Sequence, residues 1–167
     1  MKIVIVSDTH GNAANFKKVI KWLNKEKIQT ILHCGDIGTP ESLKESLVDF
    51  KGELFGVLGN MDKDFKIFIE DYNEIPRIKI DEDILEIEIN KKKIAITHFP
   101  IAAKKLAQSQ AYDLVFYGHT HKPWEEKVGE CRLINPGELA GQFYKPTFAV
   151  YDTITDKLEL KILEKLS

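Results

Sequence analysis

The chain of 167 residues has the composition of a soluble globular protein. Hydrophobic residues make up 43% and charged residues 30%, which excludes the disordered and membrane-embedded classes. A formal charge of −2 gives no general attraction for nucleic acid. A chain of this length buries a core without disulfides or a structural metal, so we expect one domain over residues 1–167, in which any metal ion serves function.

The chain carries no signal for export or membrane insertion. Met1–Val6 lacks the three-part layout of a signal peptide, and no apolar run reaches membrane-spanning length. We therefore predict a cytoplasmic protein without a membrane partner. Cys34 and Cys131 are far apart and not in a CxxC pair, which predicts two buried, reduced thiols. The sequence leaves the oligomeric state open, a homo-oligomer included.

The first third of the chain alternates buried strands with helices. Lys2–Val6 is a continuous β-branched run, typical of a strand covered on both faces. Asn12 is a candidate N-cap for a helix that extends to about Lys27, where apolar residues recur at helical spacing. Next we expect a strand, a helix capped at Thr39-Pro40-Glu41, and another strand: Thr30–Cys34, Thr39 to about Val48, and Glu53–Leu58.

The remainder contains more strands than helices. Arg77–Ile80 and Ile84–Ile89 alternate apolar and charged residues, which favours half-exposed antiparallel strands. One further helix is expected at Ile101–Gln110. The other predicted strands are Ile94–Thr97, Leu114–Tyr117, Trp124–Val128, Arg132–Ile134, Thr147–Asp152 and Leu158–Leu163. The pattern predicts one mixed α/β domain.

Short polar segments follow five of the predicted strands. They are Asp8-Thr9-His10, Gly35-Asp36, Gly59-Asn60, Thr97-His98 and Gly118-His119-Thr120-His121. Ligand sites of α/β sheets form beyond the carboxyl ends of the strands, so these segments can converge on one crevice. Four of the five histidines lie in them, although core packing does not require histidine at strand ends. Alone, Asp8 or Asn60 would suggest a turn residue or a helix cap, but the combination indicates a site.

The residue types of these segments suit divalent metal ions. Imidazole nitrogens mixed with carboxylate and amide oxygens favour manganese, nickel, iron, cobalt or zinc. Seven side chains are too many for one tetrahedral ion. Two ions that share Asp36 would leave positions for a water and a substrate oxygen, which is the arrangement for in-line displacement at phosphorus. The bridging water would then be the nucleophile.

In its motifs the chain resembles the calcineurin-like metallophosphoesterase superfamily, in its small prokaryotic phosphodiesterase branch. The pattern D-x-H, G-D, G-N, a later H and G-H-x-H is matched in order over nearly the whole chain. The resemblance implies a four-layer αββα sandwich of two mixed sheets packed face to face with helices outside. It also implies one ion held by Asp8, His10 and His121, a second held by Asn60, His98 and His119, and Asp36 as the bridge.

The chain departs from the pattern of this family at three places. Met61 stands where many members have a histidine that protonates or orients the leaving group, and the neighbouring Asp62 is either a residue that orients a ligand or a surface turn residue. Phe99 follows His98 where relatives often have glycine. Glu138 stands where serine is common. The last two differences are expected to affect the pocket or its specificity.

Two residues near the motifs have alternative interpretations. Asn12 is either only a helix cap or also part of a helix N-terminus that binds a phosphate oxygen of the substrate. His33 lies inside a strand and matches no ligand position, so we expect a hydrogen-bonded core histidine, or one that supports a ligand. The lysines at 91–93 and 104–105 are expected to be solvated, since no aromatic residues interleave with them.

The sequence predicts an enzyme that hydrolyses a small phosphoester, most simply a phosphodiester. In this hypothesis a hydroxide that bridges two metal ions attacks phosphorus, and His98 and Asn60 stabilise charge on the phosphoryl oxygens. One alternative is a protein-binding scaffold like the retromer subunit that shares this fold, but that relative has lost some metal-binding histidines. Another is a nuclease, which would need a basic groove. Nucleic acid is otherwise not an expected partner.

Overall fold

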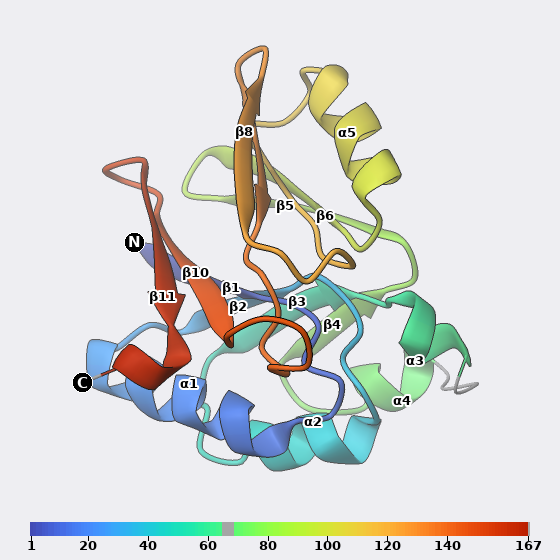
Figure 1. The fold of residues 1–167 in the computed structure, drawn as a ribbon, viewed down its shortest axis with the longest axis vertical. Coiled ribbons are helices and arrows are strands. Elements are labelled where there is room, and N and C mark those ends of the chain that lie inside the picture. Colours follow the sequence, from blue (N-terminus) through green and yellow to red (C-terminus); the bar gives the residue numbers. More distant parts are fainter. Residues whose placement is uncertain (65–68, 167) are drawn as a thin grey trace.

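The computed structural model describes residues 1–64 and 69–166 and arranges them in four layers (Figure 1). A six-stranded sheet and a five-stranded sheet pack face to face, and helices cover the outer face of each. The αββα sandwich predicted from the sequence is confirmed. No helix in the described ranges is both long and apolar enough to cross a membrane.

The six-stranded sheet is built mainly from the N-terminal half. In spatial order its strands are β11 (Lys157–Ile162), β10 (Thr147–Asp152), β1 (Lys2–Val6), β2 (Thr30–His33), β3 (Glu53–Val57) and β4 (Ile78–Asp81). The strands from β1 to β4 are parallel, and β10 is antiparallel to β1. Val4 and Val6 pack on the helix side of this sheet, while Ile3 and Ile5 pack against the other sheet. Burial on both faces explains the uninterrupted apolar run of β1.

The five-stranded sheet comes from the C-terminal half. In spatial order its strands are β5 (Ile84–Ile89), β6 (Lys92–Thr97), β7 (Leu114–Phe116), β9 (Cys131–Asn135) and β8 (Trp124–Val128). The three central strands are parallel, and both edge strands are antiparallel to their neighbours. Ile96 and Phe116 meet Ile3 and Ile5 of β1 in the core between the sheets. The carboxyl ends of β6 and β7 thereby come close to that of β1.

Helices form the two outer layers. They are α1 (Ala13–Glu26), α2 (Pro40–Ser46), α3 (Asn60–Asp64), α4 (Ile69–Asn73), α5 (Pro100–Gln108) and the 3₁₀ helix η1 (Leu163–Lys165). The expected caps are present, because the Asn12 side chain accepts the Asn15 N–H and the Thr39 side chain accepts the Ser42 N–H. In Figure 1, α1 and α2 lie below the six-stranded sheet. Ala103 of α5 packs on the outer face of the five-stranded sheet.

The structure corrects two expectations for the middle of the chain. The segment Arg77–Ile80, predicted as an antiparallel strand, corresponds to β4, which pairs in parallel with β3. Its alternating pattern comes from its position at the edge of the sheet, where one face is exposed. Ile84–Ile89 is antiparallel as predicted. The short helices α3 and α4 were not predicted, because five residues are too few for a helical period to be recognised.

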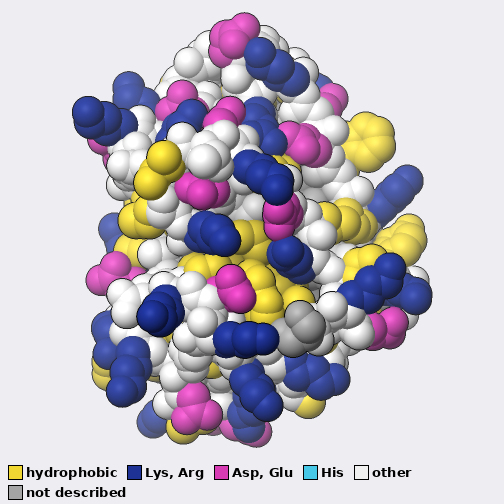
Figure 2. Space-filling model, turned by 90° about the vertical axis from the view of Figure 1, so that its left-hand side faces the viewer, with side chains coloured by type: hydrophobic (Ala, Val, Ile, Leu, Met, Phe, Trp, Pro, Cys, Tyr) yellow, Lys and Arg dark blue, Asp and Glu magenta, His cyan; other side chains and the backbone are white. Residues whose placement is uncertain are grey.

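The two sheets are joined along one side and open along the other. β3 and β4 contact β5 on the joined side, and the edge strands β8 and β11 lie on the open side. A groove between these edges is lined in part by Trp124, Ile134, Leu158 and Leu160. Figure 2 shows this side of the molecule, where hydrophobic side chains gather in the middle and charged side chains surround them.

Candidate metal centre

All seven predicted ligand residues lie at the carboxyl ends of five strands from both sheets. The six-stranded sheet contributes four of them, after β1, β2 and β3: Asp8, His10, Asp36 and Asn60. The five-stranded sheet contributes the other three, after β6 and β7: His98, His119 and His121. Residues from both halves of the chain thus meet where the two sheets pack together.

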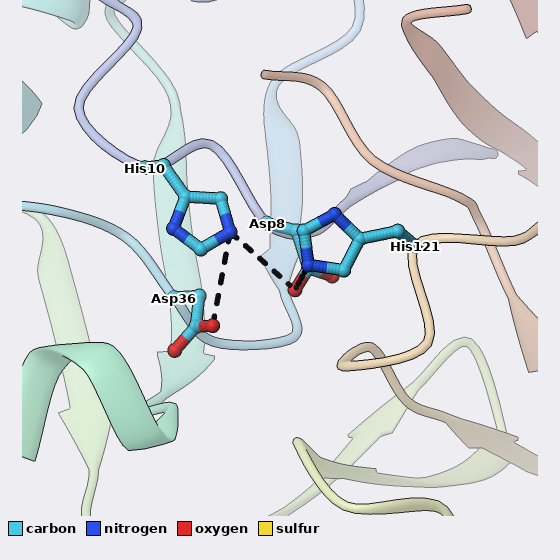
Figure 3. Close-up of side chains that lie close together, drawn as sticks. All are labelled: Asp8, His10, Asp36 and His121. Atoms are coloured by element: carbon cyan, nitrogen blue, oxygen red, sulfur yellow. Dashed lines mark ion pairs between the residues drawn. The ribbon is translucent and has the colours of Figure 1, made fainter. Parts of the chain in front are cut away.

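Asp8, His10, Asp36 and His121 form the first half of the site (Figure 3). One nitrogen or oxygen atom from each lies within 4.8 Å of those from the others. Asp8 Oδ1 is 3.4 Å from His121 Nε2 and 4.0 Å from His10 Nε2. Asp36 Oδ2 is 3.8 Å from His10 Nε2. These four side chains could hold a metal ion.

Two of these atoms provide a test of whether a cation fits. In the described part of the chain, Asp8 Oδ1 and His10 Nε2 are the buried side-chain atoms without a hydrogen-bond partner. A buried polar atom without a partner costs about 1 to 3 kcal/mol, so proteins rarely leave two of them facing the same point. Both atoms are metal ligands by chemistry, and a divalent ion would satisfy both. The donor set therefore fits a cation.

Asn60, His98 and His119 form the second half of the site. Asn60 Oδ1 is 3.1 Å from His98 Nε2 and 3.0 Å from His119 Nδ1. Bonds of about 2.1 Å to one ion would put neighbouring ligand atoms roughly 3 Å apart, which matches these separations. Asp36 Oδ2 is 3.5 Å from His98 Nε2, so the same oxygen lies near both halves. This is the position that a bridging carboxylate requires.

Burial shifts the pKa of four of the predicted ligand side chains in the direction that disfavours their charged forms. It raises the pKa of Asp8 to about 7 and raises that of Asp36 as well. It lowers the pKa of His98 to about 4, and it also lowers that of His10. Neutral histidines and carboxylates that lack solvation are the forms that gain most from a bound cation.

The backbone is left-handed at five of the seven ligand residues. Asp8, His10, Asp36, His119 and His121 have φ between +45° and +68°. Such φ values are uncommon outside glycine, and unfavourable backbone conformations persist mainly where the surrounding structure imposes them, often at functional sites. The left-handed residues turn the chain sharply after β1, β2 and β7, so that alternate side chains of a short segment face the same point.

Two glycines of the motifs allow backbone segments to approach the ligands closely. A Cβ atom at Gly59 would lie 2.0 Å from Asp36 Oδ1, and one at Gly118 would lie 2.7 Å from Asp8 Oδ2. Any side chain at either position would displace a carboxylate of the site. Close contact therefore explains both glycines better than their own backbone angles do, and at Gly118 a Cβ would also lie 2.0 Å from Ser7 Oγ.

Asp62 connects the loops that carry two of the ligands. Its buried carboxylate accepts the backbone N–H groups of Ile37, Gly38 and Gly59, at 2.8 to 3.0 Å. The alternative of a surface turn residue is wrong, because Asp62 has no exposed surface. It fixes the loop after Asp36 against the start of α3. Met61 contributes its backbone N–H, which donates to Asp36 Oδ1 at 2.9 Å.

His33 is a hydrogen-bonded core histidine that supports the loop between Asp8 and His10. Its Nδ1 accepts the Gly35 N–H at 3.2 Å, so Nε2 carries the proton and donates to Thr9 Oγ1 at 3.0 Å. Thr9 in turn donates to the Ile37 carbonyl at 2.7 Å. Burial, followed by the nearby His98 and His10, lowers the pKa of His33 to about 3. The ring is neutral at physiological pH.

Glu138, one of the three departures from the family pattern, contacts a predicted ligand. Its fully buried carboxylate lies 3.0 Å from His121 Nδ1, and the same carboxylate accepts backbone N–H groups from Gln142 and Phe143. A carboxylate on the far nitrogen orients a ligating imidazole and makes it a stronger ligand. The available signal in the sequence was that Glu138 is the one charged residue in the segment 133–142.

Phe99, another departure from the family pattern, and Asn12 both lie close to residues of the site. The Phe99 ring lies 5.1 Å from the ring of His98. Asn12 caps α1, and its amide donates to the Ala140 carbonyl at 3.0 Å, so its side chain is engaged within the chain at both ends. Its role in binding substrate stays a prediction.

Comparison with known proteins identifies the family. The model of the calcineurin-like phosphoesterase superfamily domain matches residues 1–156. The chain belongs to this superfamily. It is 34% identical to phosphodiesterase MJ0936 of Methanocaldococcus jannaschii, over 98% of this chain and all of the relative.

Solved structures of other proteins share the fold. An archaeal phosphodiesterase structure superposes with a TM-score of 0.86 at 32% identity, covering 97% of this chain and 99% of that one. The Vps29 protein of Entamoeba histolytica, complexed with Zn²⁺, reaches 0.66 at 19% identity, covering 98% and 99%. The second likeness is one of fold alone.

The neutral state of His33 predicts a specific dependence of stability on pH. The unfolded chain gains a proton below about pH 6.5 that the folded protein does not accept until about pH 3, so the free energy of unfolding falls as the pH decreases across this range. His33→Gln should reduce this loss of unfolding free energy between pH 7 and pH 4.5 by about 2.5 kcal/mol, as measured by urea denaturation with EDTA present. An identical pH dependence in both proteins would contradict this role.

The contact between Glu138 and His121 predicts weaker metal binding when the carboxylate is removed. Glu138→Gln and Glu138→Ser should lower the affinity for Mn²⁺ by roughly 10- to 100-fold, as measured by calorimetric titration. Glu130→Gln is the matched control, because the Glu130 side chain is 92% exposed. If the Glu138 variants fold and bind Mn²⁺ as tightly as the control, Glu138 does not support His121.

Proposed function

We propose that this protein is a phosphodiesterase that depends on two divalent metal ions. The observation that carries the proposal is the pair of buried atoms without partners, Asp8 Oδ1 and His10 Nε2, in a group completed by Asp36 and His121. A bound cation supplies the favourable interaction that these atoms lack. Phosphodiesterase MJ0936, all of which aligns with 98% of this chain, supports phosphodiester hydrolysis as the reaction.

In this proposal each half of the site holds one ion and Asp36 contacts both. Asp8, His10 and His121 bind the first ion, and Asn60, His98 and His119 bind the second. The distances of Asp36 Oδ2 to His10 and to His98, 3.8 and 3.5 Å, support the bridging role. Mixed imidazole and carboxylate ligands favour manganese, nickel, iron, cobalt or zinc, and metal availability decides among them.

The residues of the chain prepare the site for attack on phosphorus. Bound ions would acidify a water and neutralise charge on the phosphoryl oxygens. His98 Nδ1 donates a hydrogen bond to the Cys34 carbonyl at 2.7 Å. In the neutral ring Nε2 then carries the lone pair that can bind a metal ion, and it faces Asn60 and Asp36. His98 and Asn60 are thereby fixed where negative charge develops.

Met61 cannot supply a proton to the leaving group. The thioether side chain has no exchangeable proton, and the backbone N–H of Met61 is already donated to Asp36. In the proposed mechanism the leaving oxygen is protonated from solvent. The rate should therefore depend strongly on the pKa of the leaving alcohol, and phenolic esters should react faster than alkyl esters.

The scaffold alternative is less supported, because all seven predicted ligand residues are retained and converge. Vps29 shares the fold at only 19% identity. A nuclease would share the chemistry of the proposed enzyme and differ in its substrate. The small phosphoester substrate, the cytoplasmic location, the single domain and the oligomeric state stay predictions.

The proposal predicts activity that requires metal ions and the bridging carboxylate. The protein should hydrolyse bis(p-nitrophenyl) phosphate faster than p-nitrophenyl phosphate with Mn²⁺, Ni²⁺, Co²⁺ or Zn²⁺, and EDTA should abolish both reactions. Asp36→Ala and His98→Ala should each lower kcat by at least roughly 100-fold, since even residues that only orient a ligand contribute 10- to 100-fold. Glu130→Ala is the control.

Two results would contradict this prediction, and two others would favour an alternative function. Metal-independent hydrolysis, or full activity in both variants, would exclude the proposed site. A wild-type protein that binds no divalent ion would favour the scaffold. Faster cleavage of single-stranded DNA than of the small diester would favour the nuclease.

A further inference from the structure

Two phenylalanine side chains lie against the histidines of the site, one on each half. The Phe99 ring is 5.1 Å from the ring of His98 and 5.3 Å from that of His119. The Phe143 ring meets the ring of His121 edge-on at 5.0 Å. A phenyl ring neither binds a metal ion nor transfers a proton. Each half of the site therefore has an apolar aromatic surface beside it that the hydrolytic chemistry does not use.

Core packing does not explain the position of Phe143, which is 74% exposed. Its backbone N–H donates to the buried Glu138 carboxylate at 2.6 Å, and the N–H of Gln142 donates to the same group at 2.9 Å. An exposed phenyl ring gains little from the hydrophobic effect, yet the backbone that carries this one is held by charge-assisted hydrogen bonds to a buried carboxylate. The same carboxylate orients His121.

The segment that carries Phe143 is also tied to Asp8. The Leu139 N–H donates to the Ser7 carbonyl, and the Ala140 N–H donates to the Asp8 carbonyl, each at 3.0 Å. Phe143 is thus positioned relative to ligands of the first half by hydrogen bonds at both ends of a short loop. A ring that is already fixed loses little conformational entropy when another flat group stacks on it.

We propose that Phe143, with Phe99 on the other half of the site, forms an aromatic subsite that binds a flat aromatic group esterified to the phosphate. The inference rests on the proposed phosphodiesterase function. A phosphodiester carries two ester groups, and the one that does not leave remains beside the site during the reaction. An aryl group and a nucleobase share the chemistry that such a subsite recognises, because each has a π face for stacking.

The experiment uses three phosphodiesters that have the same p-nitrophenolate leaving group. Their second ester group is methyl, p-nitrophenyl or 5′-thymidyl, so that only this group differs. For each substrate, kcat/KM of the Mn²⁺-loaded variant is divided by that of the wild type. Phe143→Leu should lower this ratio by roughly 3- to 10-fold for the aromatic substrates relative to the methyl ester.

Two further variants separate stacking from other effects. Phe143→Trp should retain the preference for aromatic substrates, because tryptophan also stacks. Ile154→Ala, at an equally exposed apolar position in the turn after β10, should change no ratio. A role limited to covering His121 would instead lower Mn²⁺ affinity and the rates for all three substrates alike.

Each outcome decides the proposal. A selective loss with the p-nitrophenyl diester identifies an aryl subsite, and one with the thymidyl diester identifies a nucleobase subsite. Equal ratios for the three substrates in active Phe143→Leu would overturn the subsite and leave the phosphodiesterase proposal intact. A wild-type protein inactive on all three diesters would overturn both.

Discussion

The buried carboxylate of Asp8 directs one oxygen toward His10 and His121, and within the described residues neither that oxygen nor His10 Nε2 has a hydrogen-bond partner. A protein interior that holds two such atoms is unfavourable unless a cation joins them. The rest of the architecture serves this arrangement. Two sheets have to pack so that five strand ends meet, and left-handed backbone at five ligand residues has to be maintained by the surrounding structure.

Hydrogen bonds around the predicted ligands maintain this arrangement of the site. Asp62 fixes the Asp36 loop to the Asn60 loop, and His33 holds Thr9 between Asp8 and His10. Glu138 holds His121 and, through the same carboxylate, the loop of Phe143. Each group is buried and engaged with backbone or a ligand, so its effect is to fix positions before any ion or substrate binds. In the proposed enzyme, Glu138 would therefore connect metal binding at His121 with substrate selection at Phe143.

The sequence was sufficient to predict what depends on local pattern. Strand ends followed by Asp, Asn and His predicted the ligands' convergence, the apolar run of β1 predicted burial on both faces, and Cys34 and Cys131 are buried free thiols as expected. What depends on distant contacts was not predictable. The parallel pairing of β4 follows from its neighbour β3, and the contact between Glu138 and His121 joins residues on either side of two strands. Neither of these two contacts produces a periodic pattern in the sequence.

Anomalous diffraction from a crystal grown with Mn²⁺ would show whether two ions share Asp36. Two anomalous peaks are expected, one bonded to Asp8, His10 and His121 and one to Asn60, His98 and His119, each within about 2.0 to 2.3 Å of its ligand atoms. The Asp36 carboxylate should contact both. A single peak, or two peaks of which only one contacts Asp36, would contradict it.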